Sequence, residues 1–199
     1  MAFDFAPVNL THHFLIAMPG LEDPAFVKSV VYVCEHTQRG ALGLIINKPS
    51  DISLKNLFDK VELPLSRTDL SDTPVFQGGP VQTERGFVLH EPFFTAGDAP
   101  KESVYASTLT IPGGLEMTTS KDVLESLSTG GGPRRVLVTL GYASWGEGQL
   151  ESELSENSWL TVGADIAVIF DTPVAQRYER ALKLLGLQAW MLSPEAGHA

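Results

Sequence analysis

The feature that most constrains this fold is an apolar, strand-like run followed directly by a segment of glycines and carboxylates. Residues 135–140 are apolar and β-branched, a composition typical of strands that are buried on both faces. Residues 141–154 then contain three glycines, Trp145, two serines and three glutamates. We predict a strand–turn–helix corner at this place, with Trp145 and Trp159 as its anchors.

Two β-hairpins are predicted elsewhere in the chain. The first joins residues 28–36 to residues 41–48 through the loop 37–40, whose glycine can adopt positive φ. The second joins residues 103–110 to residues 115–118 through a Pro-Gly-Gly turn. Further strands are expected at 14–18, 75–77, 86–91, 166–170 and 187–192.

Helix signals are fewer than strand signals. Ser53 is expected to cap a short helix that ends near residue 61, and a second helix is expected over 120–128. The residues Asp171-Thr172-Pro173 should start the best-defined helix, which Gly186 ends. With the helix of the corner, about nine strands and four helices alternate irregularly, which predicts an α+β fold with a mostly antiparallel or mixed sheet.

Length and composition limit the organisation of the chain. A protein of 199 residues can bury one sizeable core and is short for two. Hydrophobic residues make up 43% of it and charged residues 19%, as in ordered globular proteins. We expect a loose leader over residues 1–8 and a single domain over residues 9–199.

The charge balance argues against direct binding to nucleic acid. Fourteen lysines and arginines oppose 24 aspartates and glutamates, a formal net charge of −10. A nucleic-acid partner requires a basic face, and the pair Arg134-Arg135 is too small to supply one. The partner is therefore expected to be an unknown protein or a small molecule.

The same sequence indicates a cytoplasmic protein without a membrane segment or a cofactor motif. Cys34 is the only cysteine, which excludes an internal disulfide and suits a reducing compartment. The apolar run 14–18 is too short for a signal sequence or a membrane span. The glycines 130–132 follow a helix and lack a Gly-Lys-Ser/Thr motif, so no cofactor is predicted. Gly78 and Gly79 could offer N–H groups to an anion, although a tight turn is the favoured interpretation.

Residues 142–146 resemble the nucleophile elbow of serine hydrolases, with Ser144 at the turn. That turn requires a small residue two places before the serine, and Tyr142 stands there. The one later histidine, His198, lies close to the C-terminus. We therefore disfavour a serine hydrolase.

Four glutamates near the corner could act as acid–base or metal groups: Glu147, Glu151, Glu153 and Glu156. Acids at a helix start are also favoured by the helix dipole, and this structural interpretation is preferred for three of them. Glu151 lies beside the apolar stripe of the predicted helix, so we expect it to be partly buried. A buried carboxylate requires a partner, and the candidates are Arg85, Arg134 and Arg135.

Cys34 and His36 would share one face of a strand and could begin a zinc site. A third and a fourth ligand are missing nearby, although His90 could join them in space. His12 and His13 are adjacent and would face opposite sides of a strand. The favoured interpretation is a hydrogen-bonded structural histidine in each case, and no metal site is predicted.

Several segments, in order, are similar to one known family. They are 13–19, 29–36, 43–49, 78–81, 85–90, 140–153 and Trp159-Leu160. On these residues the chain resembles the YqgE/AlgH family of bacterial proteins from Asn9 to Ala199, and the N-terminal leader is the main departure. The resemblance implies an α+β fold with a bifurcated, partly coiled sheet and a cytosolic location. The family name reflects a link to alginate regulation, and no established site residue can be carried over from it.

We therefore favour a non-enzymatic binding or regulatory protein that acts through a small ligand or a protein partner. The candidate ligand-binding residues are Asn47, Gly78, Gly79, Arg85, Trp145, Gln149 and Glu151. One alternative is a hydrolase-type enzyme that uses Glu151 with His36 or His90, which a pocket uniting such groups would favour. Another is a transcriptional regulator.

Overall fold

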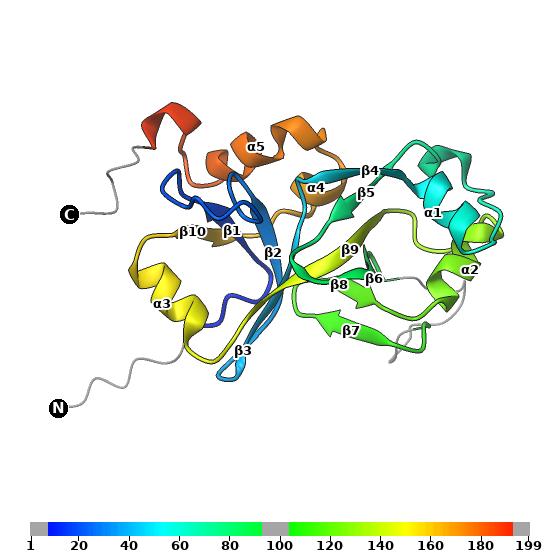
Figure 1. The fold of residues 1–199 in the computed structure, drawn as a ribbon, viewed down its shortest axis with the longest axis horizontal. Helices are drawn as coiled ribbons and strands as arrows, with labels where there is room; N and C mark the ends of the chain where they lie inside the picture. The colour runs from blue at the N-terminus through cyan, green and yellow to red at the C-terminus, as the bar shows by residue number, and fades with distance from the viewer. Residues whose placement is uncertain (1–7, 93–103, 193–199) are drawn as a thin grey trace.

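The computed structural model describes residues 8–92 and 104–192, so most of the predicted leader lies outside it. These residues form a ten-stranded sheet (Figure 1). Its strands are β1 His13–Ala17, β2 Val30–Thr37, β3 Gly40–Ile45, β4 Pro49–Ser53, β5 Pro74–Gln77, β6 Val81–His90, β7 Thr108–Ile111, β8 Leu115–Thr118, β9 Val136–Trp145 and β10 Trp159–Gly163.

Five α-helices and three short 3₁₀ helices accompany the sheet in the described ranges. The α-helices are α1 Leu54–Lys60, α2 Asp122–Ser128, α3 Gln149–Ser155, α4 Ile166–Phe170 and α5 Arg177–Lys183. The 3₁₀ helices are η1 Thr68–Leu70, η2 Val174–Gln176 and η3 Ala189–Met191. None of these helices has the length and the apolar composition that a bilayer crossing would require.

Strand β9 divides the sheet into two lobes. One edge of β9 pairs antiparallel with β6. The other edge pairs first with β5, parallel, at Thr139 and then with β3, antiparallel, at Ala143. Strands β1, β2, β3 and β10 with α3, α4 and α5 form the first lobe, and β4 to β8 with α1 and α2 form the second (Figure 1). The expected α+β fold with a bifurcated, mixed sheet is confirmed.

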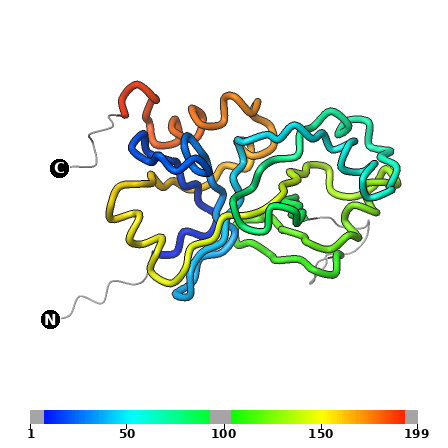
Figure 2. Tube along the Cα trace, viewed as in Figure 1, coloured from blue at the N-terminus to red at the C-terminus, as the bar shows by residue number. Residues whose placement is uncertain are grey.

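The two lobes meet where the chain after β5 crosses β9 at backbone contact. Gly78 N–H donates to the Leu140 carbonyl at 2.9 Å, and the Gly78 carbonyl accepts from Ile45 N–H at 2.9 Å. A Cβ on Gly78 would lie 2.3 Å from the Gly141 oxygen, and one on Gly79 would lie 2.1 Å from the Tyr142 carbonyl carbon. Figure 2 shows the Cα trace of the two lobes converging at the centre of the molecule. Glycine is therefore the only residue that fits at either position.

Three hydrophobic clusters fill the molecule, and β9 contributes to each. The first, which includes Leu137, packs α4 and α5 on one face of the sheet. The second, which includes Trp145, lies under α3 on the opposite face. The third, which includes Val138, lies under α1 and α2. Side chains that alternate along β9 thus belong to different cores.

Local signals in the sequence located both hairpins and one helix start. Thr37 pairs with Gly40, and Ile111 pairs with Leu115, so both predicted hairpins are confirmed. Ser53 caps α1 as expected: its hydroxyl accepts from the N–H of Asn56, whose side chain accepts from the N–H of Ser53. These features depend on residues a few positions apart.

Two predicted strands and one predicted cap are wrong. Residues 166–170 form α4, because the Asp165 side chain accepts from Ala167 N–H and starts a helical turn. Residues 187–192 contain η3, and Trp190 is 76% exposed, so this segment joins no sheet edge. Asp171 does not cap a helix, because its carboxylate pairs with Arg135 instead. A short apolar run does not distinguish a strand from a buried helix.

The crossing predicts a large difference between two glycine-to-alanine substitutions. Gly79→Ala should lower the free energy of unfolding by more than about 3 kcal/mol, because the new methyl group meets rigid backbone. Gly86→Ala is the matched control, since nothing lies within 4 Å of its Cβ position, and its effect should stay within about 0.5 kcal/mol. Urea unfolding followed by tryptophan fluorescence measures both values. Similar stabilities for the two variants would contradict the crossing.

Candidate functional site

A cavity of about 400 Å³ lies beside the crossing of the two lobes. We call it the crossover crevice. The first lobe and the segment after it contribute residues from the loop before β2, from β3 and from the chain between β3 and β4. The second lobe contributes residues from β4, from β5 and β6 and from the loop between β5 and β6, and β9 contributes one. The lining residues are Pro24, Ala25, Ile45, Lys48, Ser50, Gln77, Gly79, Pro80, Thr83 and Leu140. The crevice is thus built by both lobes, and most of its walls are apolar.

Lys48 is the one ionisable side chain in the described lining of the crossover crevice. Its ammonium group donates to the carbonyls of Pro24 at 3.2 Å and Ala25 at 3.0 Å. Burial lowers the pKa of Lys48, and the nearby carboxylate of Asp23 opposes the change. An ammonium group has three N–H donors, so one donor is left for a ligand. No described carboxylate forms an ion pair with Lys48.

Two further hollows adjoin the crossover crevice. One, of about 670 Å³, also has Lys48 in its lining and extends past Asn47 to Tyr178 of α5. The other, of about 520 Å³, shares Thr83 with the crevice and is formed by residues 82–85, where β6 bulges away from β9. The concave surface therefore runs from α5 across the crossing to β6.

Four of the candidate residues lie along this concave surface. Asn47 and Gly79 line it, Gly78 is at the crossing, and Arg85 stands at the β6 end. The Asn47 amide is already engaged, because it accepts from Val30 N–H and donates to the Lys28 carbonyl, both at 2.9 Å. Gly78 cannot offer its N–H to an anion, because that group donates to Leu140. Lys48, which sequence reasoning missed, supplies the free polar group instead.

The other three candidates lie around α3 in the first lobe and not on this surface. Trp145 is buried in the second cluster, against Phe26 and Trp159. The Gln149 side chain accepts from Gly146 N–H at 3.0 Å and so closes the turn before α3. Glu151 contacts His36. The structure therefore divides the predicted site into two separate groups.

His36 and Glu151 form a hydrogen-bonded pair whose orientation is fixed by the backbone. Leu10 N–H donates to His36 Nδ1 at 3.0 Å, so this nitrogen carries no proton. His36 Nε2 must then carry the proton, which it donates to Glu151 Oε1 at 2.7 Å. The sequence had suggested an arginine as the partner of Glu151. That expectation is wrong, because the partner is His36. The neutral imidazole joins β2, α3 and the segment before β1.

The hydrolase alternative would be favoured by a pocket that unites a histidine with a buried carboxylate or Ser144. Both imidazole nitrogens are engaged, and neither His36 nor Glu151 lines the crevice or the two hollows beside it. Ser144 is exposed on β9, and its hydroxyl makes no hydrogen bond to a described histidine or carboxylate. His198, the later histidine of the elbow comparison, lies outside the described residues.

A β-bulge separates Cys34 from His36, so the predicted shared face is wrong. Val33 pairs with Gly43 and Glu35 with Leu42, which leaves Cys34 as the extra residue. Cys34 therefore stays in the first cluster, whereas His36 turns toward α3. His90 is occupied in the second lobe, where Nε2 contacts the Thr118 hydroxyl at 2.7 Å. Among the described residues, no group of three His, Cys, Asp or Glu side chains could hold a metal ion.

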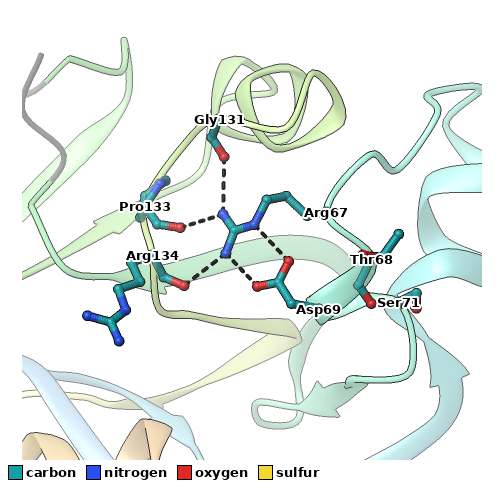
Figure 3. A network of polar contacts seen from close by, with 7 residues as sticks. All are labelled: Arg67, Thr68, Asp69, Ser71, Gly131, Pro133 and Arg134. Carbon is teal, nitrogen blue, oxygen red and sulfur yellow. Dashed lines mark hydrogen bonds and ion pairs between the residues drawn. The ribbon is translucent and has the colours of Figure 1, made fainter.

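The sequence also gave no sign of an arginine that ties two distant loops together. All five N–H donors of Arg67 are used (Figure 3). Three bonds go to the carbonyls of Gly131, Pro133 and Arg134, and two go to the Asp69 carboxylate. Because the acceptors far along the chain are backbone carbonyls, no side-chain motif marks them. Arg67 is a structural residue.

Glu153, and not Glu151, is the more buried glutamate of α3. The Glu151 side chain is 49% exposed, whereas one carboxylate oxygen of Glu153 is fully buried and lacks a hydrogen-bond partner. Glu153 follows Leu150 by three positions and therefore shares its buried stripe. Burial raises the pKa of Glu153, and the N–H groups of Trp145 and Trp159 oppose the rise.

The His36–Glu151 pair predicts unequal effects of its two substitutions. His36→Ala should cost about 2–3 kcal/mol of stability, because it leaves the Leu10 N–H buried without an acceptor. Glu151→Gln should cost less than about 1 kcal/mol, because its amide oxygen still accepts from Nε2 and the site is half exposed. Chemical denaturation of both variants checks this order. A larger loss for Glu151→Gln would show that the charge, and not the hydrogen bond, holds the pair.

The raised pKa of Glu153 predicts a pH-dependent gain from Glu153→Gln. The folded state holds the proton of Glu153 more tightly than the unfolded chain does, so the stability that this one group contributes is lost as the pH rises above about 4.5, the usual glutamate pKa. The amide has no charge to bury, so Glu153→Gln should melt above the wild type at pH 7, and the difference should vanish by pH 4. Thermal melts at both pH values measure it. The exposed Glu156→Gln is the control, and an equal pH-dependent gain there would refute the assignment.

Sequence comparison relates the chain to a widespread group of bacterial proteins. A family profile described as AlgH-like matches residues 14–190. A UPF0301 protein of Variovorax paradoxus is 79% identical over 199 residues, which is 100% of both chains. A UPF0301 protein of a Polaromonas species is 78% identical over 199 residues and also covers 100% of both chains.

Solved structures agree with the sequence comparison. The solution structure of the AlgH protein from Pseudomonas aeruginosa has 46% identity and a TM-score of 0.74, and the match covers 98% of this chain and 99% of that one. A crystal structure of a Corynebacterium diphtheriae protein, 18% identical with a TM-score of 0.67, covers 92% of this chain and 90% of that one and shares the fold alone. With the profile matched over most of its length, the chain belongs to the AlgH-like family.

Proposed function

We propose that this protein is a non-enzymatic binding protein whose crossover crevice holds a small acidic molecule. The observation that supports the proposal is the position of Lys48. Its ammonium group is partly buried and forms no ion pair with a described carboxylate, and Lys48 lines a cavity with otherwise uncharged walls. A positive group in such surroundings interacts strongly with an anion, because little water screens it.

The walls of the crevice suggest the chemistry of the rest of the ligand. Pro24, Ile45 and Leu140 offer apolar surface. Gln77 and Thr83 contribute an amide and a hydroxyl group to the same lining. A few polar groups within a mostly apolar cavity are typical of sites for small organic molecules. We infer a ligand with one acidic group and an apolar body.

The same lining argues against catalysis at this place. General acid–base chemistry needs a titratable group within hydrogen-bond reach of the reacting atom, and covalent catalysis needs an activated nucleophile. Lys48 is the one ionisable group in the described lining, and its ammonium is held by two carbonyls. Binding without turnover is the function that this arrangement supports.

The position of the crevice between the lobes also suits a regulatory protein. A ligand there would contact the 24–25 segment of the first lobe together with Gln77 and Thr83 of the second. Ligand binding can alter a protein only through contacts that differ between its conformations. Contacts to both lobes allow such a difference, which a protein partner could then detect.

Native mass spectrometry of protein purified from its own host cells tests this proposal. The wild type should carry a small acidic molecule as an added mass. Lys48→Met should lose that mass, because the anion then has no charged partner in the crevice. Lys55→Met, on the exposed face of α1, is the matched control and should retain it.

Two outcomes would contradict the proposal. The first is a wild-type protein that carries no added mass under gentle ionisation. The second is an added mass that Lys48→Met retains at the wild-type level. Circular dichroism melts of the two lysine variants establish that both are folded, so that a lost ligand reflects the lost ammonium group.

A further inference from the structure

A further cavity, of about 260 Å³, shares Val174 with the hollow of about 670 Å³ and none of its lining with the other two. It is enclosed by β5, the start of β9, the end of α4, and η2 with the first residue of α5. Its described lining includes Arg134, Arg135 and Arg177 together with Asp69 and Asp171, and we call it the arginine cavity. It shares no lining residue with the crossover crevice.

Both carboxylates of the arginine cavity are already paired. Asp69 accepts from Arg67 Nε at 2.9 Å and from Arg67 Nη2 at 2.8 Å. Asp171 pairs with Arg135, which also binds Glu91. Neither carboxylate is therefore left to neutralise Arg134 or Arg177. The cavity carries surplus positive charge in a protein whose formal net charge is −10.

Arg177 is a buried cation that forms no ion pair with any carboxylate in residues 8–92 and 104–192. The residue is 6% exposed, Nε donates to the Thr172 carbonyl at 3.0 Å, and Nη1 donates to the Ile46 carbonyl. Its guanidinium carbon lies 5.0 Å from the centre of the Phe76 ring. Burial lowers the pKa of Arg177 to about 10, which leaves the side chain charged at neutral pH. A buried charge is costly unless an opposite charge approaches it.

Arg134 supplies a second unpaired guanidinium from a different wall. Its backbone carbonyl accepts from Arg67 at 3.0 Å, while its side chain points away from that network (Figure 3). Within the described ranges, the Arg134 side chain forms no hydrogen bond and no ion pair. Arg134 precedes β9 and Arg177 starts α5, so the two arginines line the cavity from separate elements.

We propose that the arginine cavity binds a phosphate group, with Arg177 as the buried anchor and Arg134 as the outer contact. A guanidinium group matches the oxygens of phosphate with parallel hydrogen bonds. Phosphate is tetrahedral and can accept from two walls at once, whereas a carboxylate presents its oxygens in one plane. The volume suits a phosphate group and is small for a whole nucleotide.

Thermal shift and isothermal titration calorimetry with inorganic phosphate, at pH 7 and constant ionic strength, test this site. At ten times its Kd, phosphate should raise the wild-type melting temperature by about 3 °C or more relative to chloride. Arg134→Met should weaken phosphate binding at least about tenfold. Arg180→Met, an exposed arginine on α5 outside the cavity, should bind phosphate as the wild type does.

The Arg134 variant keeps the test decisive even if Arg177→Met does not fold. Arg177 makes two hydrogen bonds in the fold, whereas the Arg134 side chain makes none, so Arg134→Met should retain wild-type stability. Phosphate binding that is absent up to 20 mM, or equal in wild type and Arg134→Met, would overturn the proposal. Acetate that binds as tightly as phosphate would overturn it as well.

The phosphate group could be free inorganic phosphate or part of a larger metabolite, and a third ligand distinguishes these two sources. Tighter binding of sn-glycerol 3-phosphate than of inorganic phosphate would support a phosphate group carried by a larger metabolite. Equal binding of both would support free phosphate as the ligand. In each case the loss in Arg134→Met must accompany the binding, because both ligands use the same guanidinium groups.

Discussion

The close contact between two backbones at the lobe junction is the constraint on which the rest of the structure depends. Gly78 and Gly79 approach β9 so closely that a single methyl group would overlap backbone atoms. This approach lets the Gly78 carbonyl accept from Ile45 of the first lobe while its N–H donates to Leu140. The sheet can therefore divide at this point without leaving these groups unpaired, which a dry interior would penalise.

The same junction explains where polar chemistry concentrates in a largely apolar interior. Chain segments that cross, rather than pair along their length, leave hollows beside the crossing. Lys48 occupies one hollow, and Arg177 occupies another on the far side of β5. Arg67 shows the contrasting case, since all of its donors find acceptors within the fold. Cations that the fold satisfies maintain structure, and cations that it leaves unpaired are available for ligands.

Sequence reasoning succeeded where the signal is local and failed where packing decides. The cap at Ser53 and the turn between Thr37 and Gly40 depend on neighbouring residues, so both were predictable. The helix over residues 166–170 was not, because five apolar residues fit either type of element once they are buried. The family resemblance, rather than any periodicity, indicated that the sheet would divide.

The candidate sites were harder to predict, because their residues are brought together only by long-range contacts. One extra residue at Cys34 reversed the facing of His36, and nothing in the local sequence marks that bulge. No local pattern in the sequence marks Lys48 or Arg177 as a buried or partly buried cation. The burial of Arg177 depends on an element 131 residues away, as its bond to the Ile46 carbonyl shows, and Lys48 is held by carbonyls 23 and 24 residues away. The predicted binding residues Asn47 and Gly79 do lie at or beside the crevice. Lys48, which carries the charge there, was not among the predicted residues.

Because β9 belongs to all three cores, neither lobe can be completed until residues 136–145 have left the ribosome. The eight preceding strands must wait as a nascent chain with unpaired edges, and β1 must wait longer still for β10. Topologies dominated by such distant pairings fold slowly and expose surface that can aggregate. Both lobes of the described chain therefore close late, once β9 and then β10 supply the partners that the earlier strands lack.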